Sequence, residues 1–530
     1  MKRTLSIVLA LVALCAAFVV ACGKDSGSDA AGKRDDPRPE RVSAAAAAGK
    51  PNVIFIYTDD QNLAEFEPRY MPRTFELLAD PGTVFSDFVV ATPLCCPSRA
   101  SYLTGDYPHN SGVFSNRRGY SELKGKFNVL PVWMRNAGYR TAWVGKYLQG
   151  YEAAVDDPFE AAPGIDDWHA TFDPLYYDFE IADNGERVQV GNRSRDYYTN
   201  VITREATDVI DRQLQRRRPL YMTVNNLAPH HGGGDAGRCT NVVPPAPRDE
   251  DLYASAKIPR TAGFDERDVS DKPEVVARDP LTAEKIERLD LAYGCRLASL
   301  RGVDRSIASI HEAVERAGEL PDTVFIFSSD NGILQGQHRI GGKNIPYGEG
   351  VQQPLVMLAG KRALGGRAVS SVDQLTANVD LAPTILELAG AEPCARPGNC
   401  RELDGQSLVP LLLGRQGSGI DEGREVLVEG GKAGGDCLYA GIRTRGLNYI
   451  QHAEEAPDGT CDRNVATELY DLDGELTGNP DPLELDNLAS PAVAAGSDPG
   501  VRAEISRLSR RLERLRACSG ATCHSPPVAP

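Results

Sequence analysis

The sequence predicts an α/β fold built on a large, mixed but mostly parallel sheet flanked by helices. Four short apolar runs, rich in β-branched residues, end abruptly in polar residues: residues 52–58, 140–145, 220–224 and 323–329. Such runs are typical of strands that are buried on both faces. Helical patterns lie between them, at residues 198–215 and 282–317. This alternation favours a parallel sheet, in which ligands bind beyond the carboxyl ends of the strands.

The composition is that of a soluble globular protein, with 41% hydrophobic and 25% charged residues. A length of 530 residues suggests more than one domain, although a large α/β sheet can run long as a single unit. The formal net charge of −16 argues against a general nucleic-acid binder, so we expect no nucleic-acid partner. An anionic substrate must therefore be attracted by a local basic pocket.

The N-terminus has the pattern of a targeting segment. Lys2 and Arg3 precede an apolar run that ends at Val20, as in a signal peptide. The sequence Val19-Val20-Ala21-Cys22 resembles a bacterial lipobox, so we expect a lipoprotein signal peptide at residues 1–22. Lipidated Cys22 would then anchor the protein to the membrane, on the bacterial cell surface or the periplasmic side; a plain secretory signal is the alternative. Residues 23–50 contain almost no large apolar side chain and read as a flexible linker.

The twelve cysteines suggest a set of disulfides, which an exported chain can form. Setting aside Cys15, Cys22 and Cys95, close spacing predicts three pairs: Cys394–Cys400, Cys437–Cys461 and Cys518–Cys523. Cys239–Cys295 is then the remaining pair, with Cys96 as a buried free thiol. Spacing alone does not fix the connectivity. Zinc is not expected, because no C-x-x-C pair or histidine cluster accompanies these cysteines.

Hard oxygen donors follow two of the predicted strands. Asp59 and Asp60 come directly after residues 52–58, and Asp330 and Asn331 after residues 323–329. Either pair alone would more often be a turn. Because both lie at strand ends, three carboxylates and an amide oxygen can meet at one edge of the sheet. That set suits one hard divalent cation per chain, with Ca²⁺ favoured and Mg²⁺ as the alternative.

The run from Cys95 to Gly105, Cys-Cys-Pro-Ser-Arg-Ala-Ser-Tyr-Leu-Thr-Gly, resembles the C-x-P-S-R-x-x-x-x-T-G signature of the type I, formylglycine-dependent sulfatases. In that family a formylglycine-generating enzyme oxidises the first cysteine to an aldehyde residue before export. The resemblance implies that Cys95 is converted, whereas Cys96 occupies the variable position. It also implies that the cation is bound by the strand-end donors and by an oxygen of residue 95: Asp59, Asp60, Asp330 and Asn331.

The family resemblance implies roles for further residues and an overall organisation. Arg99 orients the formylglycine, Lys146 and Lys343 bind the sulfate, and His230 binds the ester. A helix beginning after Pro97 points its N-terminal dipole at this site. The implied fold is alkaline-phosphatase-like, with a catalytic domain at residues 51–425, a small C-terminal α+β subdomain at 426–516 and a tail at 517–530.

One position departs from the family. Many members have K-x-H where this chain has Lys146-Tyr147-Leu148, and the histidine helps to release sulfate. Leucine carries no proton, so His109, His231 or solvent must serve instead. The Gly-Lys-Tyr-Leu form resembles the N-acetylglucosamine-6-sulfatase branch, as does the sequence from Thr58 to Gln61. This favours a sulfated sugar or another sulfated small molecule as substrate.

The expected activity is therefore hydrolysis of a sulfate ester. The resemblance implies that one hydroxyl of the hydrated aldehyde attacks sulfur, and that the aldehyde re-forms as sulfate departs. Two alternatives stay open: a phosphate or phosphonate monoester hydrolase on the same scaffold, and a catalytically silent binder of sulfated glycans.

Overall fold

The computed structural model describes residues 49–215, 218–415, 419–432, 435–456, 461–491 and 498–524. The predicted signal peptide with Cys22, nearly all of the linker and the end of the tail lie outside these residues. The described residues belong to one compact unit. Within them, no helix is both long and apolar enough to cross a membrane.

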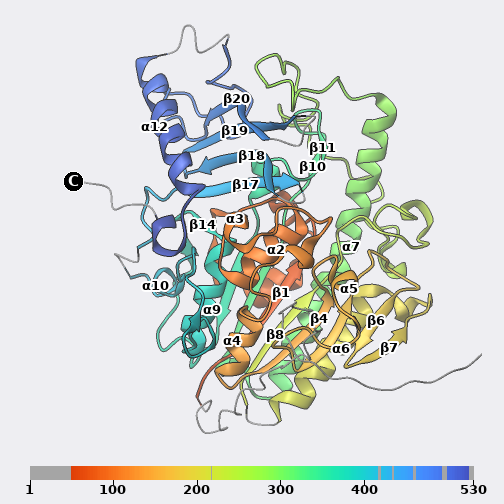
Figure 1. The fold of residues 1–530 in the computed structure, drawn as a ribbon. Coiled ribbons are helices and arrows are strands. Elements are labelled where there is room, and N and C mark those ends of the chain that lie inside the picture. Colours follow the sequence, from red (N-terminus) through yellow and green to blue (C-terminus); the bar gives the residue numbers. More distant parts are fainter. Residues whose placement is uncertain are drawn as a thin grey trace, which may run out of the picture. The chain divides into compact units, whose positions relative to one another are not determined.

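A ten-stranded mixed sheet forms the centre of this unit (Figure 1), in the order β13-β2-β12-β9-β1-β8-β4-β5-β6-β7. Five neighbouring strands run parallel: β9 (Thr323–Ser329), β1 (Asn52–Thr58), β8 (Leu220–Asn225), β4 (Arg140–Lys146) and β5 (Asp167–Thr171). The antiparallel pairs lie outside them and involve β12 (Leu355–Ala359), β2 (Thr83–Phe85), β6 (Glu180–Asp183) and β7 (Glu186–Gln189). At one edge, β13 (Ser371–Val372) runs parallel to β2. The predicted mixed sheet with a parallel centre is confirmed.

Helices cover both faces of the sheet, which explains the continuous apolar runs. Alternate residues of a strand point to opposite faces. Ile54 of β1 enters a core shared with α6 (Tyr198–Leu214) and α7 (Ala283–Arg316). Phe55 enters a second core, on the other face, to which three helices contribute: α2 (Cys95–Thr104), α4 (Leu130–Asn136) and α9 (Leu381–Ala389). Both long helices lie where the sequence predicts them, and the Thr282 side chain caps α7 by accepting from Lys285 N at 3.2 Å.

A second, smaller sheet follows the large one in the chain. It is four-stranded and antiparallel, in the order β17 (Val426–Lys432), β18 (Gly435–Arg443), β19 (Leu447–Glu455) and β20 (Cys461–Asp471). Helix α12 (Pro499–Leu515) packs its Leu508 and Leu512 into the same core. This is the expected small α+β subdomain, and its first strand starts at Val426.

The predicted disulfides are confirmed. Among the described residues four bridges occur: Cys239–Cys295, Cys394–Cys400, Cys437–Cys461 and Cys518–Cys523. Cys95 and Cys96 are free and buried. The covalent framework therefore leaves both cysteines of the signature motif unpaired.

Candidate active site

The polar residues at the carboxyl ends of the parallel strands converge as predicted. Asp59 and Asp60 follow β1, Asp330 and Asn331 follow β9, and Lys146 is the last residue of β4. All five are almost completely buried. Arg99 on α2, together with Cys95, His230 and Lys343, completes the cluster, so the structure brings every sequence-predicted site residue together.

Asp59 is the centre of this cluster. Its carboxylate accepts from Arg99 Nη2 at 3.0 Å and also contacts Lys146 Nζ, while Arg99 Nε donates to Asp330 Oδ2 at 2.8 Å. Burial alone would raise the pKa of Asp59, but the surrounding Lys146, His230 and Arg99 outweigh it and hold that pKa well below its usual range. Burial and the adjacent Asp59 carboxylate raise the pKa of Asp330 to about 6.

Cys95 lies at the start of α2, beside Lys343. Lys343 Nζ is 3.0 Å from Cys95 Sγ and 2.7 Å from Asp60 Oδ1. The helix begins at Cys95 rather than after Pro97, because proline is tolerated in a first turn, where amide donors have no intrahelical partner. Burial and the nearby Asp59 carboxylate raise the pKa of the Cys95 thiol to about 12. The unmodified thiol is therefore protonated and a poor nucleophile.

The oxygen donors fit a hard divalent cation. The Asn331 amide nitrogen donates to Asp60 Oδ1 at 2.6 Å, whereas the Asn331 Oδ1 atom is buried and has no partner among the described residues. A buried acceptor atom that has no partner and lies beside carboxylates would be satisfied by a cation. Side-chain atoms of Asp59, Asp60, Cys95 and His230 also lie within 4.8 Å of one another; the two carboxylates supply the oxygen donors of this group, whereas Cys95 offers sulfur and His230 nitrogen. Carboxylate and amide oxygens in this arrangement suit Ca²⁺ or Mg²⁺.

Two glycines allow the strand ends to come this close. Gly145, before Lys146, has φ +95°, and a Cβ there would stand 2.1 Å from the Asn225 carbonyl oxygen. A Cβ on Gly332, directly after Asn331, would stand 1.9 Å from the Glu349 carbonyl oxygen. A side chain at position 145 would push the end of β4, with Lys146, away from β8, and one at position 332 would displace the segment of Asp330 and Asn331 from α8 (Gly348–Val351).

His230 is the imidazole that faces the cluster. Its Nε2 lies 3.6 Å from Asp60 Oδ2 and 3.9 Å from Asp59 Oδ1. Its Nδ1 bonds the backbone carbonyl of His231, whose own side chain is exposed. That bond places the His230 proton on Nδ1 and leaves the Nε2 lone pair directed at the carboxylates. Leu148 is buried and supplies no polar atom.

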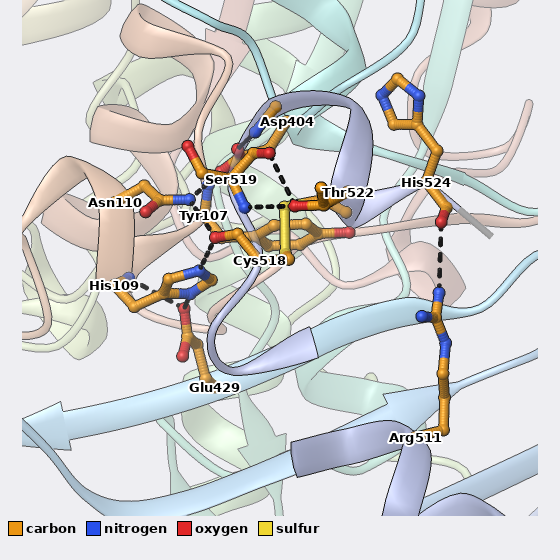
Figure 2. The surroundings of a disulfide bond; sticks show 12 residues. Tyr107, His109, Asn110, Asp404, Glu429, Arg511, Cys518, Ser519, Thr522 and His524 are labelled. Carbon is orange, nitrogen blue, oxygen red and sulfur yellow. Dashed lines mark hydrogen bonds and ion pairs between the residues drawn. A yellow bond between two sulfur atoms is a disulfide. The ribbon is translucent and has the colours of Figure 1, made fainter. Parts of the chain in front are cut away.

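The expectation that His109 approaches this cluster is wrong. Figure 2 shows His109 between Glu429 and Cys518. Its Nδ1 lies 2.7 Å from Glu429 Oε1 and its Nε2 lies 2.9 Å from the Cys518 carbonyl oxygen. Both ring nitrogens are thus bonded where α3 (Pro108–Ser111) meets β17 and the Cys518–Cys523 disulfide.

We expect His109→Ala to lower the free energy of unfolding by about 3–5 kcal/mol, because it removes the imidazolium that balances the buried Glu429 carboxylate and leaves the backbone N–H of residue 109 as its remaining described partner. Burial opposes protonation, but Glu429 outweighs it and raises the pKa of His109 to about 9. The stabilisation is therefore complete below about pH 6.5 and is lost as the pH rises through about 9. Denaturant unfolding of wild type and variant across that window should show their difference shrinking.

His231→Ala is the control for this prediction, because the side chain is exposed and should leave stability unchanged. Equal stability of wild type and His109→Ala at pH 6 would contradict the structural role. A burst of alcohol product followed by stalled turnover in His109→Ala would instead return this residue to the catalytic step.

Two further residues hold the site, Asn225 and Arg296, and the sequence assigns neither of them a specific role. Asn225 Oδ1 accepts from Arg99 Nη1 at 3.0 Å, and its position at the end of β8 could have indicated it. Arg296, in the middle of α7, donates to the carbonyl oxygens of Asp60 and Pro229 and to Glu65. No local sequence pattern indicates that an arginine inside a helix bonds two loops that are distant in the sequence, here those of Asp60 and Pro229.

Known proteins share both sequence and fold with this chain. A sequence model of the family described as Sulfatase matches residues 51–391. The N-acetylglucosamine-6-sulfatase of Homo sapiens is 30% identical over 526 residues, which cover 91% of this chain and 88% of that protein. An extracellular sulfatase SULF-1 homolog of Drosophila melanogaster is 31% identical over 388 residues, or 71% of this chain and 33% of its own length. A Caenorhabditis elegans relative of similar description is matched over 49% of its length, so the chain spans a third to a half of these two proteins.

Solved structures share the fold at low sequence identity. A protein in complex with its substrate D-glucosamine-2-N,6-O-disulfate has a TM-score of 0.66 and 21% identity, covering 88% of this chain and 98% of that one. A phosphonate monoester hydrolase of Agrobacterium radiobacter has a TM-score of 0.64 and 20% identity, covering 88% and 96%. The expected alkaline-phosphatase-like fold is confirmed by such neighbours.

Proposed function

Because the chain belongs to the sulfatase family, we propose that it is a sulfuric ester hydrolase that acts on a sulfated sugar. One observation carries the proposal: Cys95, first residue of the signature helix, lies against Lys343 within the buried cluster of Arg99, Lys146 and hard oxygen donors. Cationic groups around a single small residue suit an anionic ester that must be held and attacked. The similarity to N-acetylglucosamine-6-sulfatases supports a carbohydrate substrate.

Formylglycine, formed from Cys95 by the maturation enzyme, would supply a hydrated aldehyde as nucleophile. Asp59, Asp60, Asp330, Asn331 and an oxygen of residue 95 would hold the cation, which would supply electrostatic stabilisation. Residues of the chain itself orient the carboxylates, bind the ester and transfer the proton. Arg99 bridges Asp59 and Asp330 and so fixes these two carboxylates relative to each other.

The remaining charged groups divide the work around the ester. Lys146 and Lys343 stabilise the negative charge that grows on the sulfuryl oxygens. Lys343 carries protons 3.0 Å from Cys95 Sγ and is the group we assign to protonate the leaving oxygen, whereas the His230 Nε2 lone pair accepts from the substrate. With Leu148 in place of the family histidine, solvent assists sulfate release.

The phosphate or phosphonate monoester hydrolase is the second candidate, since a phosphonate monoester hydrolase shares the fold. Wild-type enzyme should turn over 4-nitrophenyl sulfate with a kcat/KM at least about a hundredfold above that for 4-nitrophenyl phosphate. The reverse preference would establish the alternative. No turnover of either ester, with residue 95 converted and metal present, would leave the silent glycan binder.

We propose that the bound cation is one Ca²⁺ per chain, with Mg²⁺ as the alternative. The support is the all-oxygen set of protein ligands, without a nucleotide phosphate to complete the shell of a smaller ion. Elemental analysis of purified protein should find calcium near one equivalent. Zinc as the tightly bound metal would contradict this assignment.

We further propose that the protein functions outside the cytoplasm, held at the membrane through lipidated Cys22 and the linker of residues 23–50. The lipobox-like sequence and the four disulfides of the described residues support an exported protein. The proposed division has the catalytic domain at residues 51–425, the subdomain at 426–516 and the tail at 517–530. Cys22→Ser should release the protein from membranes or leave it unprocessed. A wild-type protein that is freely soluble, with its mature N-terminus elsewhere than Cys22, would refute the anchor.

A further inference from the structure

A hollow of about 420 Å³ lies between the loops that follow β5, β7 and β8. Its volume falls within the range of small-molecule sites and accommodates a sugar ring. Four exposed polar residues line it: Asp178, Asn192, Asp235 and Asn241. None of the described residues that line it is basic. The hollow is therefore polar and negatively charged, in contrast to the cation-rich cluster around Cys95.

The hollow lies at the same edge of the sheet as the candidate active site. Strands β8 and β5 flank β4 and run parallel to β1, so their following loops stand beside the end of β1. Neighbouring strands are about 4.8 Å apart, so the carboxyl ends of β8 and β5 stand about 5 Å and about 14 Å from that of β1. Gly233, on the wall of the hollow, is three residues after His230, so their Cα atoms are at most about 11 Å apart. The Tyr176 hydroxyl donates to the His230 carbonyl oxygen at 2.7 Å, which holds this wall of the hollow close to His230.

We propose that this hollow is the subsite for the sugar next to the sulfated one, and that it selects an uncharged neighbour. The proposal rests on the proposed sulfatase activity and names its substrate class. Amide and carboxylate side chains bind sugar hydroxyls, whereas Asp178 and Asp235 repel a carboxylate or a second sulfate. A 6-sulfated N-acetylglucosamine joined to a neutral hexose fits this surface, and the same sugar joined to a hexuronate does not.

Two disaccharides that differ only in whether the neighbouring sugar carries a hydroxymethyl group or a carboxylate test this selection. Wild-type kcat/KM should favour the neutral disaccharide by at least about tenfold. In Asp178→Asn/Asp235→Asn the ratio should fall towards one, chiefly because the uronate disaccharide improves. Asparagine tolerates the left-handed backbone of Asp178 (φ +54°), so folding is preserved.

Filling the hollow is an independent test. Asn192 is exposed, so Asn192→Trp should fold normally and lower kcat/KM for both disaccharides by at least about tenfold, while 4-nitrophenyl sulfate turnover stays unchanged. The matched control is Glu475→Gln/Glu513→Gln, which removes two exposed carboxylates from the C-terminal subdomain and should leave every ratio unaltered.

The outcomes separate this proposal from the activity on which it rests. A wild-type enzyme that cleaves 4-nitrophenyl sulfate but prefers the uronate disaccharide, or fails to discriminate, overturns the subsite and leaves the sulfatase assignment intact. An unchanged ratio in Asp178→Asn/Asp235→Asn does the same. If no ester is cleaved, calorimetric binding of the two disaccharides to the Cys95→Ala protein still decides: equal affinities, or no binding, overturn the subsite.

Discussion

Cys95→Ala should abolish sulfate-ester hydrolysis, with kcat falling by at least about 10⁵-fold. Loss of a covalent nucleophile has an effect of this size in other hydrolases, because the surrounding charges bind the ester but have nothing to attack it with. Alanine also removes the sulfur that maturation must oxidise. The measurement is 4-nitrophenyl sulfate turnover by wild type and variant, both loaded with metal.

Cys96→Ala is the matched control. Cys96 is buried next to Cys95, but its backbone N–H donates to Asn116 Oδ1 at 2.8 Å and its Sγ accepts from Gln149 N at 3.1 Å, so it packs against neighbouring loops. Its replacement should cost stability and retain turnover. Full activity in Cys95→Ala, or equal loss in both variants, would contradict a unique role for residue 95.

Asp59→Asn should lower kcat/KM by at least about 10³-fold and abolish stoichiometric metal binding. The Asp59 carboxylate faces Arg99, Lys146, His230 and the thiol of Cys95, which lies 3.5 Å away. An amide removes the charge that balances these cations and weakens a ligand that hard divalent ions require. Metal content by elemental analysis and turnover with added calcium measure the two effects separately.

Asp304→Asn is the control for losing a buried carboxylate away from the site. Asp304, on α7, is completely buried and accepts from the Thr74 backbone at 2.8 Å. Its replacement should lower stability but leave metal stoichiometry and kcat/KM unchanged. If Asp59→Asn behaved like Asp304→Asn, the oxygen cluster would not be a catalytic metal site.

Much of the fold follows from local pattern. The strands β1 and β9 lie where the sequence predicts them, because strands covered by helices on both faces need continuous apolar runs. The site follows from the same pattern, since parallel strands end at one edge and bring Asp59, Lys146 and Asp330 together. Three disulfide pairs could be predicted because their cysteines are close in the sequence. The fourth, Cys239–Cys295, could be predicted because these two cysteines remained after the close pairs were assigned.

What the sequence does not predict depends on contacts between distant segments. Arg296 clamps the Asp60 and Pro229 loops from inside a helix, where arginine usually reads as a solvated charge. His109 follows the signature motif closely, yet its ring is bonded by Glu429 and Cys518. The position of the His109 ring depends on the packing of the C-terminal subdomain, which cannot be predicted from the short distance in sequence between His109 and the signature motif.

The mass of one tryptic peptide tests the central claim most directly. Cleavage after Arg73 and Arg99 gives residues 74–99, which contain both Cys95 and Cys96. In active protein, reduced and alkylated before digestion, we predict one alkylated cysteine at position 96 and an aldehyde oxygen in place of the thiol at position 95. Active protein in which both cysteines are intact and alkylated would contradict the account.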